Sequence, residues 1–126
     1  MSHPIVQLQA ALVTALRAEI EPPVFDAPPK DSAPPYVTIA RHDVLPRDGD
    51  MAPGHEHRVL LHVWAADASR KSVLAIAEDV IDVALDLTSD DIAITLGRHD
   101  RTDTAIDAGT GRARAAIAFT FFTEQI

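Results

Sequence analysis

Two segments of the chain repeat apolar residues at the spacing of an α-helix, and each stripe predicts an amphipathic helix. One helix is expected over 4–20, with Pro4 in its first turn, where a missing N–H is no loss. Its apolar face consists of Ile5, Leu8, Leu12, Ala15 and Leu16. The second helix is expected over 69–87, and its wider apolar face consists of Val73, Ile76, Ala77, Val80, Val83 and Leu87.

Four other segments alternate apolar and polar residues, which is the pattern of half-buried β-strands. The predicted strands span 36–42, 55–64, 92–104 and 112–123. The connector over 21–35 holds six of the nine prolines, so we expect it to be stiff and extended, with Val24 and Phe25 held against the core. Residues 43–54 form a polar loop that is long for a hairpin.

The order of these elements, α-β-β-α-β-β, predicts an α+β fold in a single domain over 1–126. We expect a two-layer sandwich, in which an antiparallel four-stranded sheet carries two helices on one face. A weak internal repeat agrees with two similar halves, because VTIARHD at 37–43 recurs as ITLGRHD at 94–100. The outer sheet face is expected to carry small and apolar residues, which favours cover by a partner or by another copy of the chain.

The composition narrows the possible functions. The net charge of −8 argues against tight binding of DNA or RNA, which needs clustered Lys and Arg. Cysteine is absent, which excludes disulfides, thiolate zinc sites and cysteine nucleophiles. No apolar run reaches the ~20 residues of a membrane span, so no membrane association is expected. No phosphate-binding loop or serine-nucleophile motif occurs, so we predict no cofactor and no catalytic residue.

The strand HEHRVLLHVW holds three of the six histidines and is the first candidate for a metal site. Because side chains alternate across a strand, His55 and His57 share one face and His62 points to the other. The same parity places His42 and His99 on the outer face, so no third ligand is expected, and zinc needs at least three. We therefore predict no metal site and interpret His55 and His57 as solvated residues next to the loop.

The chain resembles the tail terminator family of long-tailed phages, also called tail completion or minor tail proteins, over nearly its whole length. The likeness lies in the amphipathic start LQAALVTALRAEI, in VFDAPPKDSAPPYVTI and in HRVLLHVWA after the loop. Its most recognisable points are Pro34–Tyr36, which enters the first strand, and Val63–Trp64, which closes the second. Relatives occur in phages, defective prophages and gene transfer agents, and the residues leave the kind of particle open.

The resemblance implies a non-enzymatic structural protein in the tail of a phage-like particle, assembled in the bacterial cytoplasm. It implies a homo-oligomeric ring, expected to be a hexamer, at the head-proximal end of the tail tube. Its partners would be the tail tube protein and the head–tail connector protein, with DNA passing through the ring without specific binding. Two alternatives stay open: a connector or neck protein of the same particle, and a small metal-dependent hydrolase using His55, His57 and one further histidine.

In the ring hypothesis, the polar loop and its flanks form the surface that contacts the tube or the next subunit. The residues concerned are Arg47, Asp48, Asp50, His55 and His57. Trp64 is the only tryptophan of the chain, and it has two interpretations: a half-buried aromatic at a strand end, or an interface anchor. We include it among the candidate contact residues.

Overall fold

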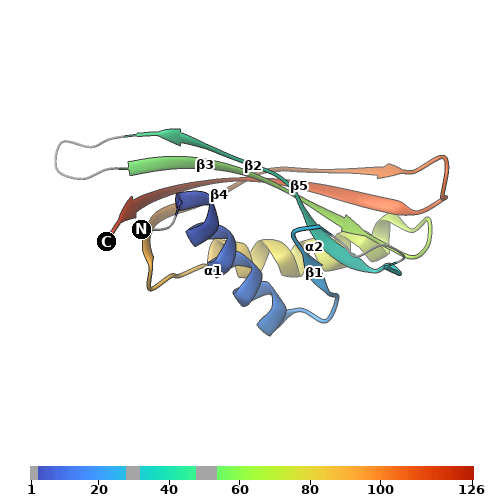
Figure 1. Ribbon diagram of the computed structural model, residues 1–126. Helices are drawn as coiled ribbons and strands as arrows, with labels where there is room; N and C mark the ends of the chain where they lie inside the picture. Colours follow the sequence, from blue (N-terminus) through green and yellow to red (C-terminus); the bar gives the residue numbers. More distant parts are fainter. Residues whose placement is uncertain (1–2, 28–31, 48–53) are drawn as a thin grey trace.

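Five strands form one mixed sheet in the order β1-β2-β3-β5-β4, and both helices lie against one of its faces (Figure 1). The structure, a computed structural model, describes residues 3–27, 32–47 and 54–126. Within these ranges, no helix is long and apolar enough to span a membrane. The elements are α1 (Pro4–Glu19), β1 (Val24–Phe25), β2 (Tyr36–Pro46), β3 (Gly54–Trp64), α2 (Arg70–Leu85), β4 (Ile92–Ile106) and β5 (Ala113–Gln125).

The predicted four-stranded antiparallel sheet is wrong, because the proline-rich connector contributes a fifth strand that runs parallel to its neighbour. β1 pairs with β2 through Val24↔Val37 and Phe25↔Thr38, and the N–H of Val37 donates to the carbonyl oxygen of Pro23 at 2.9 Å. Prolines are compatible with an edge strand, because only one side of that strand needs hydrogen bonds. With β1 included, the order is α-β-β-β-α-β-β, and the other four strands pair antiparallel.

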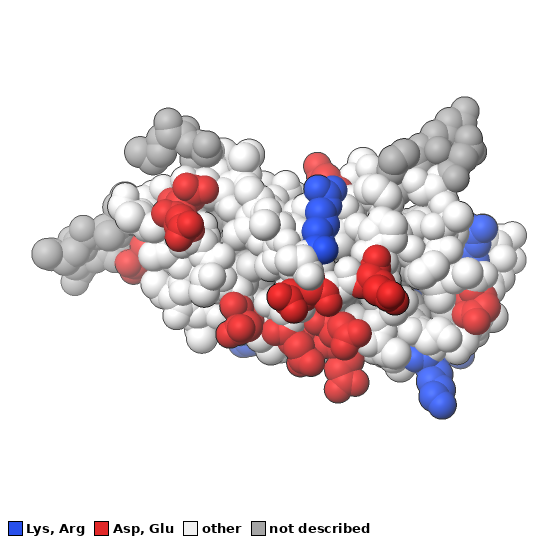
Figure 2. Space-filling model, turned by 90° about the horizontal axis from the view of Figure 1, so that it is seen from below, with Lys and Arg blue, Asp and Glu red and all other residues white. Residues whose placement is uncertain are grey.

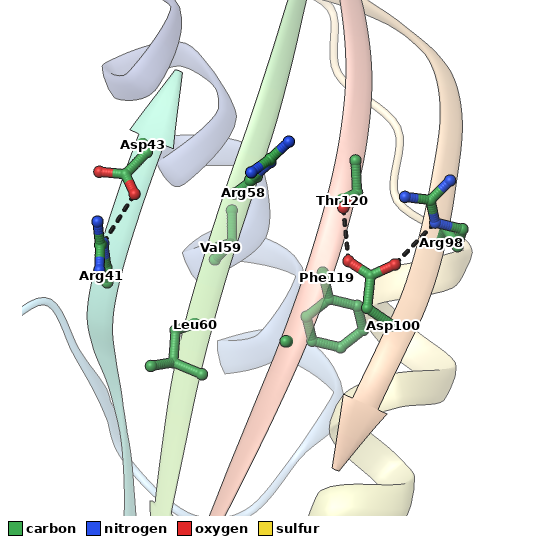
Figure 3. Close-up of a pocket in the computed structure, with 10 residues that line it drawn as sticks. Arg41, Asp43, Arg58, Val59, Leu60, Arg98, Asp100, Phe119 and Thr120 are labelled. Carbon is green, nitrogen blue, oxygen red and sulfur yellow. Dashed lines mark hydrogen bonds and ion pairs between the residues drawn. The ribbon is translucent and has the colours of Figure 1, made fainter. Parts of the chain in front are cut away.

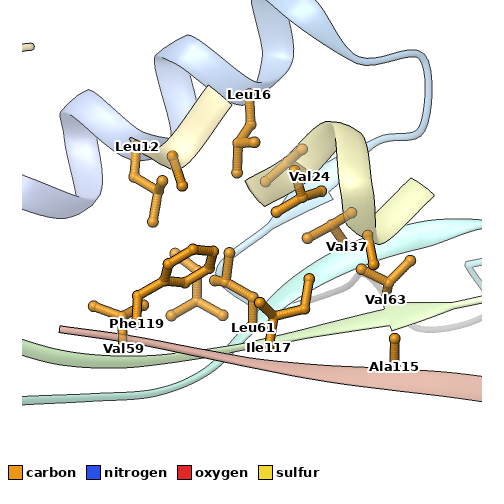
Figure 4. Close-up of a cluster of buried hydrophobic side chains, with 14 of the residues drawn as sticks. Leu12, Leu16, Val24, Val37, Val59, Leu61, Val63, Ala115, Ile117 and Phe119 are labelled. Atoms are coloured by element: carbon orange, nitrogen blue, oxygen red, sulfur yellow. The ribbon is translucent and has the colours of Figure 1, made fainter. Parts of the chain in front are cut away.

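The hydrophobic core lies between the helices and the sheet face that they cover (Figure 4). The helices contribute Leu8, Leu12 and Leu16 from α1, and Val73, Ala77, Val80 and Ala84 from α2. The strands contribute Val37, Val59, Leu61, Val63, Ile117 and Phe119, among others. Each fully buried leucine stabilises the fold by roughly 1.5–3 kcal/mol. The apolar stripes of both helices therefore pack against one face of the sheet, and neither helix covers the other face.

Two long hairpins extend past the helices in opposite directions (Figure 1). The first consists of β2 and β3, and the second consists of β4 and β5. The loop predicted over 43–54 is shorter than expected, since β2 continues to Pro46 and β3 begins at Gly54. At the end of this hairpin, the N–H of Arg47 donates to the carbonyl oxygen of Gly54 at 2.7 Å. The two strands of the first hairpin therefore extend further than predicted and form a long arm.

Three β-bulges decide which side chains face the helices. Each inserts one extra residue into a strand: Ala40 in β2, and Thr95 and Asp100 in β4. After a bulge the alternation shifts by one residue, so the side chains that follow exchange faces. The prediction that His42 and His99 lie on the outer face is wrong for this reason, because both rings point to the helix side.

Candidate assembly surface

An open hollow of about 440 Å³ lies on the sheet face that the helices leave uncovered (Figure 3). Residues of β2, β3, β4 and β5 line it. They are Arg41, Asp43, Arg58, Val59, Leu60, Arg98, Asp100, Ala118, Phe119 and Thr120. The predicted small residues of the outer face are present on β5, where Ala118 and Thr120 line the hollow. The prediction is wrong for β2 and β4, because the bulges at Ala40 and Thr95 turn Arg41 and Arg98 outward.

Two arginine–aspartate ion pairs stand on opposite sides of the hollow (Figure 3). On β2, Nε of Arg41 lies 2.7 Å from Oδ2 of Asp43, and on β4, Nε of Arg98 lies 2.7 Å from Oδ1 of Asp100. These four residues belong to the two Arg-His-Asp segments of the internal repeat. The repeat therefore places equivalent ion pairs on β2 and β4. Sequence reasoning did not select them as site residues, and the recurrence of Arg-His-Asp is the signal that could have done so.

Asp100 differs from Asp43 in having a second hydrogen bond. The hydroxyl of Thr120 on β5 donates to its Oδ2 at 2.5 Å. The hydrogen bond from Thr120, and then that from Arg98, hold the pKa of Asp100 below its ordinary value. The β4 pair is therefore tied to the neighbouring strand, whereas the β2 pair lies within a single strand.

Arg58 occupies the middle of the hollow and shares a carboxylate with Arg47, one of the predicted contact residues. Nε of Arg58 lies 3.0 Å from Oε2 of Glu56, and Nε of Arg47 lies 3.1 Å from Oε1. The hydrogen bonds from Arg58 and Arg47 lower the pKa of Glu56, which is only 6% exposed. Glu56 therefore stays ionised and holds both arginine stems along the outer face of the arm.

The three arginines of the hollow keep most of their hydrogen-bonding capacity. Each guanidinium carries five N–H donors, and each contacts its carboxylate through Nε. In the described part of the chain, the terminal amino groups of Arg41, Arg58 and Arg98 donate to no residue. Their side chains are 72%, 62% and 57% exposed. The hollow can therefore accept carboxylates from outside without breaking its own ion pairs.

The helix side of the molecule has the opposite character. Seen from that side, acidic side chains gather over the helices (Figure 2). The exposed carboxylates of the two helices and of the C-cap of α2 belong to Glu19, Glu78, Asp79, Asp82 and Asp86. Among the described residues, none of these five forms an ion pair. A groove of about 360 Å³ between the helices is lined by Glu19, Asp82 and Asp86 together with Ala15, Ala18 and Val83.

Two histidines of the first hairpin, His42 and His57, form a buried polar chain with Thr123 on the helix side of the sheet. Nε2 of His42 and Nδ1 of His57 share a hydrogen bond of 2.8 Å, and Nε2 of His57 lies 2.9 Å from the hydroxyl of Thr123. Burial lowers the pKa of both His42 and His57 to about 4. His57 is 0% exposed, so its interpretation as a solvated residue is wrong. The bulge at Ala40 contributes to this burial, because it brings His42 to the face that His57 occupies, while Phe121 of β5 lies opposite His57 on its other side.

Residues 6–124 match the family described as Tail completion protein gp17. The chain belongs to this family. Among solved structures, 21 chains match, and one of them is a chain of "Virion of native gene transfer agent (GTA) particle". It is 24% identical, the match covers 98% of this chain and 99% of that chain, and the TM-score is 0.81, which shows a shared fold. None of the curated proteins matches.

Membership in the tail completion family confirms the resemblance seen in the sequence and identifies a structural protein of phage-like tails. The hydrolase alternative finds no ligand set, because no group of three or more His, Asp or Glu side chains in the described ranges is arranged to hold a metal ion. The nearest approach is the His42–His57 pair, whose nitrogens bond to each other rather than to a common point.

The remaining predicted contact residues lie at both ends of the sheet. His55 is half-buried on the helix side of the arm, with its ring centre 6.3 Å from that of His57. Trp64 is half-buried at the far end of β3, on the open face, and its ring meets that of His62 edge-on at 6.5 Å. Asp48 and Asp50 lie outside the described residues. The structure therefore does not bring the predicted contact residues into one site.

Proposed function

We propose that this tail completion protein forms a ring, a hexamer, at the head-proximal end of a phage-like tail tube. There it ends polymerisation of the tube and joins the tail to the head–tail connector protein. The observation that carries the proposal is the family match over 6–124, because it accounts for nearly the whole described domain. The fold likeness to a chain of a gene transfer agent virion supports a place in such a particle, assembled in the bacterial cytoplasm.

The charge distribution supports passage of DNA through the ring without specific binding. The chain carries a net charge of −8, which repels phosphate. The arginines of the open face do not form a free basic patch, since Arg41 is accompanied by Asp43 and Arg98 by Asp100. DNA binding needs clustered basic residues that replace counterions on the phosphates, and these paired arginines are poorly suited to that role.

The first hairpin is the part that we propose to reach the tube or the next subunit. Arg47 and His55 lie near its tip, and Arg47 is exposed. Trp64 lies at the other end of β3, where a half-buried aromatic on the open face suits an interface anchor. His57 has no exposed surface, so its role in this proposal is to support the arm from inside.

Deletion of the gene in a particle-producing strain tests the proposal, with electron microscopy of the tails as the measurement. We expect tubes of uncontrolled length and heads without tails, because nothing ends polymerisation or bridges to the connector. Expression of the chain from a plasmid should restore tails of uniform length. Tails of normal length in the deletion strain would overturn the role in ending the tube.

The same experiment separates the rival role of a connector or neck protein. A neck protein acts on the head, so its loss would leave tails of uniform, normal length that are not attached to heads. Overlong tubes distinguish the two roles, because a cap acts on the growing end of the tube, whereas a neck protein acts on the head. Immunogold labelling of the chain at the head-proximal tip of free tails supplies a second, independent measurement.

A further inference from the structure

The two faces of the molecule carry groups that match each other and that a single chain leaves unmatched. On the open sheet face, Arg41, Arg58 and Arg98 present terminal amino groups that donate to no described residue. On the helix side, the carboxylates of Asp82 and Asp86 line the α1–α2 groove and form no ion pair among the described residues. Guanidinium donors on one face and free carboxylates on the other are complementary.

We propose that the hollow of the open sheet face binds the acidic α1–α2 groove of a second copy of this chain. The inference rests on the proposed ring and names the two surfaces that join its subunits. Each copy offers one hollow and one groove, so every copy can contact two neighbours. Such a contact joins two different surfaces, and repeated contacts of this kind close into a ring when the rotation between copies divides a full turn.

The chemistry of the contact follows from the geometry of the side chains. A guanidinium binds a carboxylate through two parallel N–H donors, and this fork is available on all three arginines because each contacts its own acid through Nε. Apolar side chains lie within both surfaces. Leu60 and Ala118 line the hollow, and Ala15, Ala18 and Val83 line the groove. The contact therefore combines paired charges with apolar surface that a monomer leaves in water.

A charge exchange between the two faces tests the contact. The sheet variant carries Arg41→Glu and Arg98→Glu, and the helix variant carries Asp82→Arg and Asp86→Arg. Each variant alone places like charges against each other, and we expect its self-association to weaken roughly 100-fold. In an equimolar mixture, the acidic sheet of one variant meets the basic helices of the other, and the unaltered faces also match. The mixture should therefore assemble into rings in which the two variants alternate.

Sedimentation velocity of the wild-type chain, of each variant and of the mixture is the measurement, in low-salt buffer where exposed charges are screened least. Expected are oligomers for the wild type and the mixture, and monomers for each variant alone. Arg112→Glu, which reverses one charge at the β4–β5 turn, should associate like the wild type. Circular dichroism establishes that every variant is folded.

Several results would overturn the contact. The wild type could stay monomeric in low salt, the single-face variants could associate normally, or the mixture of folded variants could stay monomeric. Binding of tube protein that is lost in the sheet variant alone would show that the hollow serves the tube instead. These outcomes are independent of the tail-length measurement, so the contact can fail while the capping role stands, and the reverse is also possible.

Discussion

The two hairpins contain the same Arg-His-Asp sequence. Its Arg and Asp form the same ion pair on the open face of both hairpins, but its His has different contacts on the helix side. On the open face, Arg41 with Asp43 and Arg98 with Asp100 form ion pairs of the same length, 2.7 Å. On the helix side, His42 hydrogen-bonds to the buried His57, whereas His99 lies against an aromatic ring. The two hairpins therefore share the same outer ion pair, while the interior beneath it differs.

The interior of the second hairpin is aromatic. Phe119 and Phe121 stack with ring centres 5.8 Å apart, and the ring of His99 lies 5.8 Å from that of Phe119. Gly97 makes room for this arrangement, because a Cβ at that position would lie 3.1 Å from the ring of Phe121. The first hairpin instead relies on hydrogen bonds between titratable rings. One half should consequently be sensitive to lost volume and the other to protonation.

The largest effect is expected from Phe119→Ala, which removes the centre of the aromatic interior. Phe119 is 1% exposed, and replacing a buried phenylalanine by alanine typically costs about 3–5 kcal/mol of the free energy of unfolding. Urea denaturation followed by far-UV circular dichroism measures this loss. Phe119→Leu, which retains most of the apolar volume, should lose clearly less. A loss below about 1 kcal/mol for Phe119→Ala would contradict the central position of this ring.

The next effect is a pH dependence that originates in the first hairpin. The pKa values of His42 and His57 are about 4 in the folded chain, whereas an unfolded chain titrates near the ordinary 6.5. Burial is the main cause for both, and the charges of neighbouring histidines add to it for His57. Between these values the unfolded state binds more protons, so the free energy of unfolding decreases as pH falls from 6.5 toward 4. We expect a loss on the order of 2 kcal/mol from His57.

Urea denaturation at a series of pH values measures this slope, and His57→Gln provides the control. The amide can still form hydrogen bonds but does not titrate, so the variant should be less stable at pH 7 and lose less stability on acidification. Glu56 and Asp100 are carboxylates with lowered pKa values, so their effect on stability falls at lower pH than that of the histidines. The pH range of the loss therefore separates the two kinds of group. An unchanged slope in His57→Gln would assign the pH dependence to other groups.

Periodicity in the sequence was sufficient to predict both helices and the four long strands, because their apolar residues recur at 3.6 or 2 positions. It missed β1, since two residues between prolines show no alternation. It also misassigned His42, because a bulge has no residue signature of its own. The bulge shows in the sequence only as a change of parity, because Ile39 and Val44 are an odd number of positions apart and still share one face. The hollow depends on the order of strands in the sheet, which local patterns do not contain.

The smallest effect compares the two outer ion pairs directly. Asp43→Ala removes a pair whose side chains are 72% and 48% exposed, so the free energy of unfolding should change by less than about 0.5 kcal/mol. Asp100→Ala also removes the acceptor for the hydroxyl of Thr120, a residue only 2% exposed. A buried hydroxyl without its acceptor costs about 1 kcal/mol or more, so this variant should be measurably less stable. Urea denaturation of both variants at pH 7 checks the difference.

Thr120→Val decides whether the difference comes from that hydroxyl. In a double-mutant cycle, Asp100→Ala should cost much less in the Thr120→Val background, because no donor is then left without an acceptor. The same cycle with Asp43→Ala should be additive, since Asp43 and Thr120 share no hydrogen bond in the described structure. Equal losses for Asp43→Ala and Asp100→Ala would mean that the two pairs are equivalent in energy as well as in sequence. A coupling confined to Asp100 would show that the second pair is anchored to β5 and that the first is not.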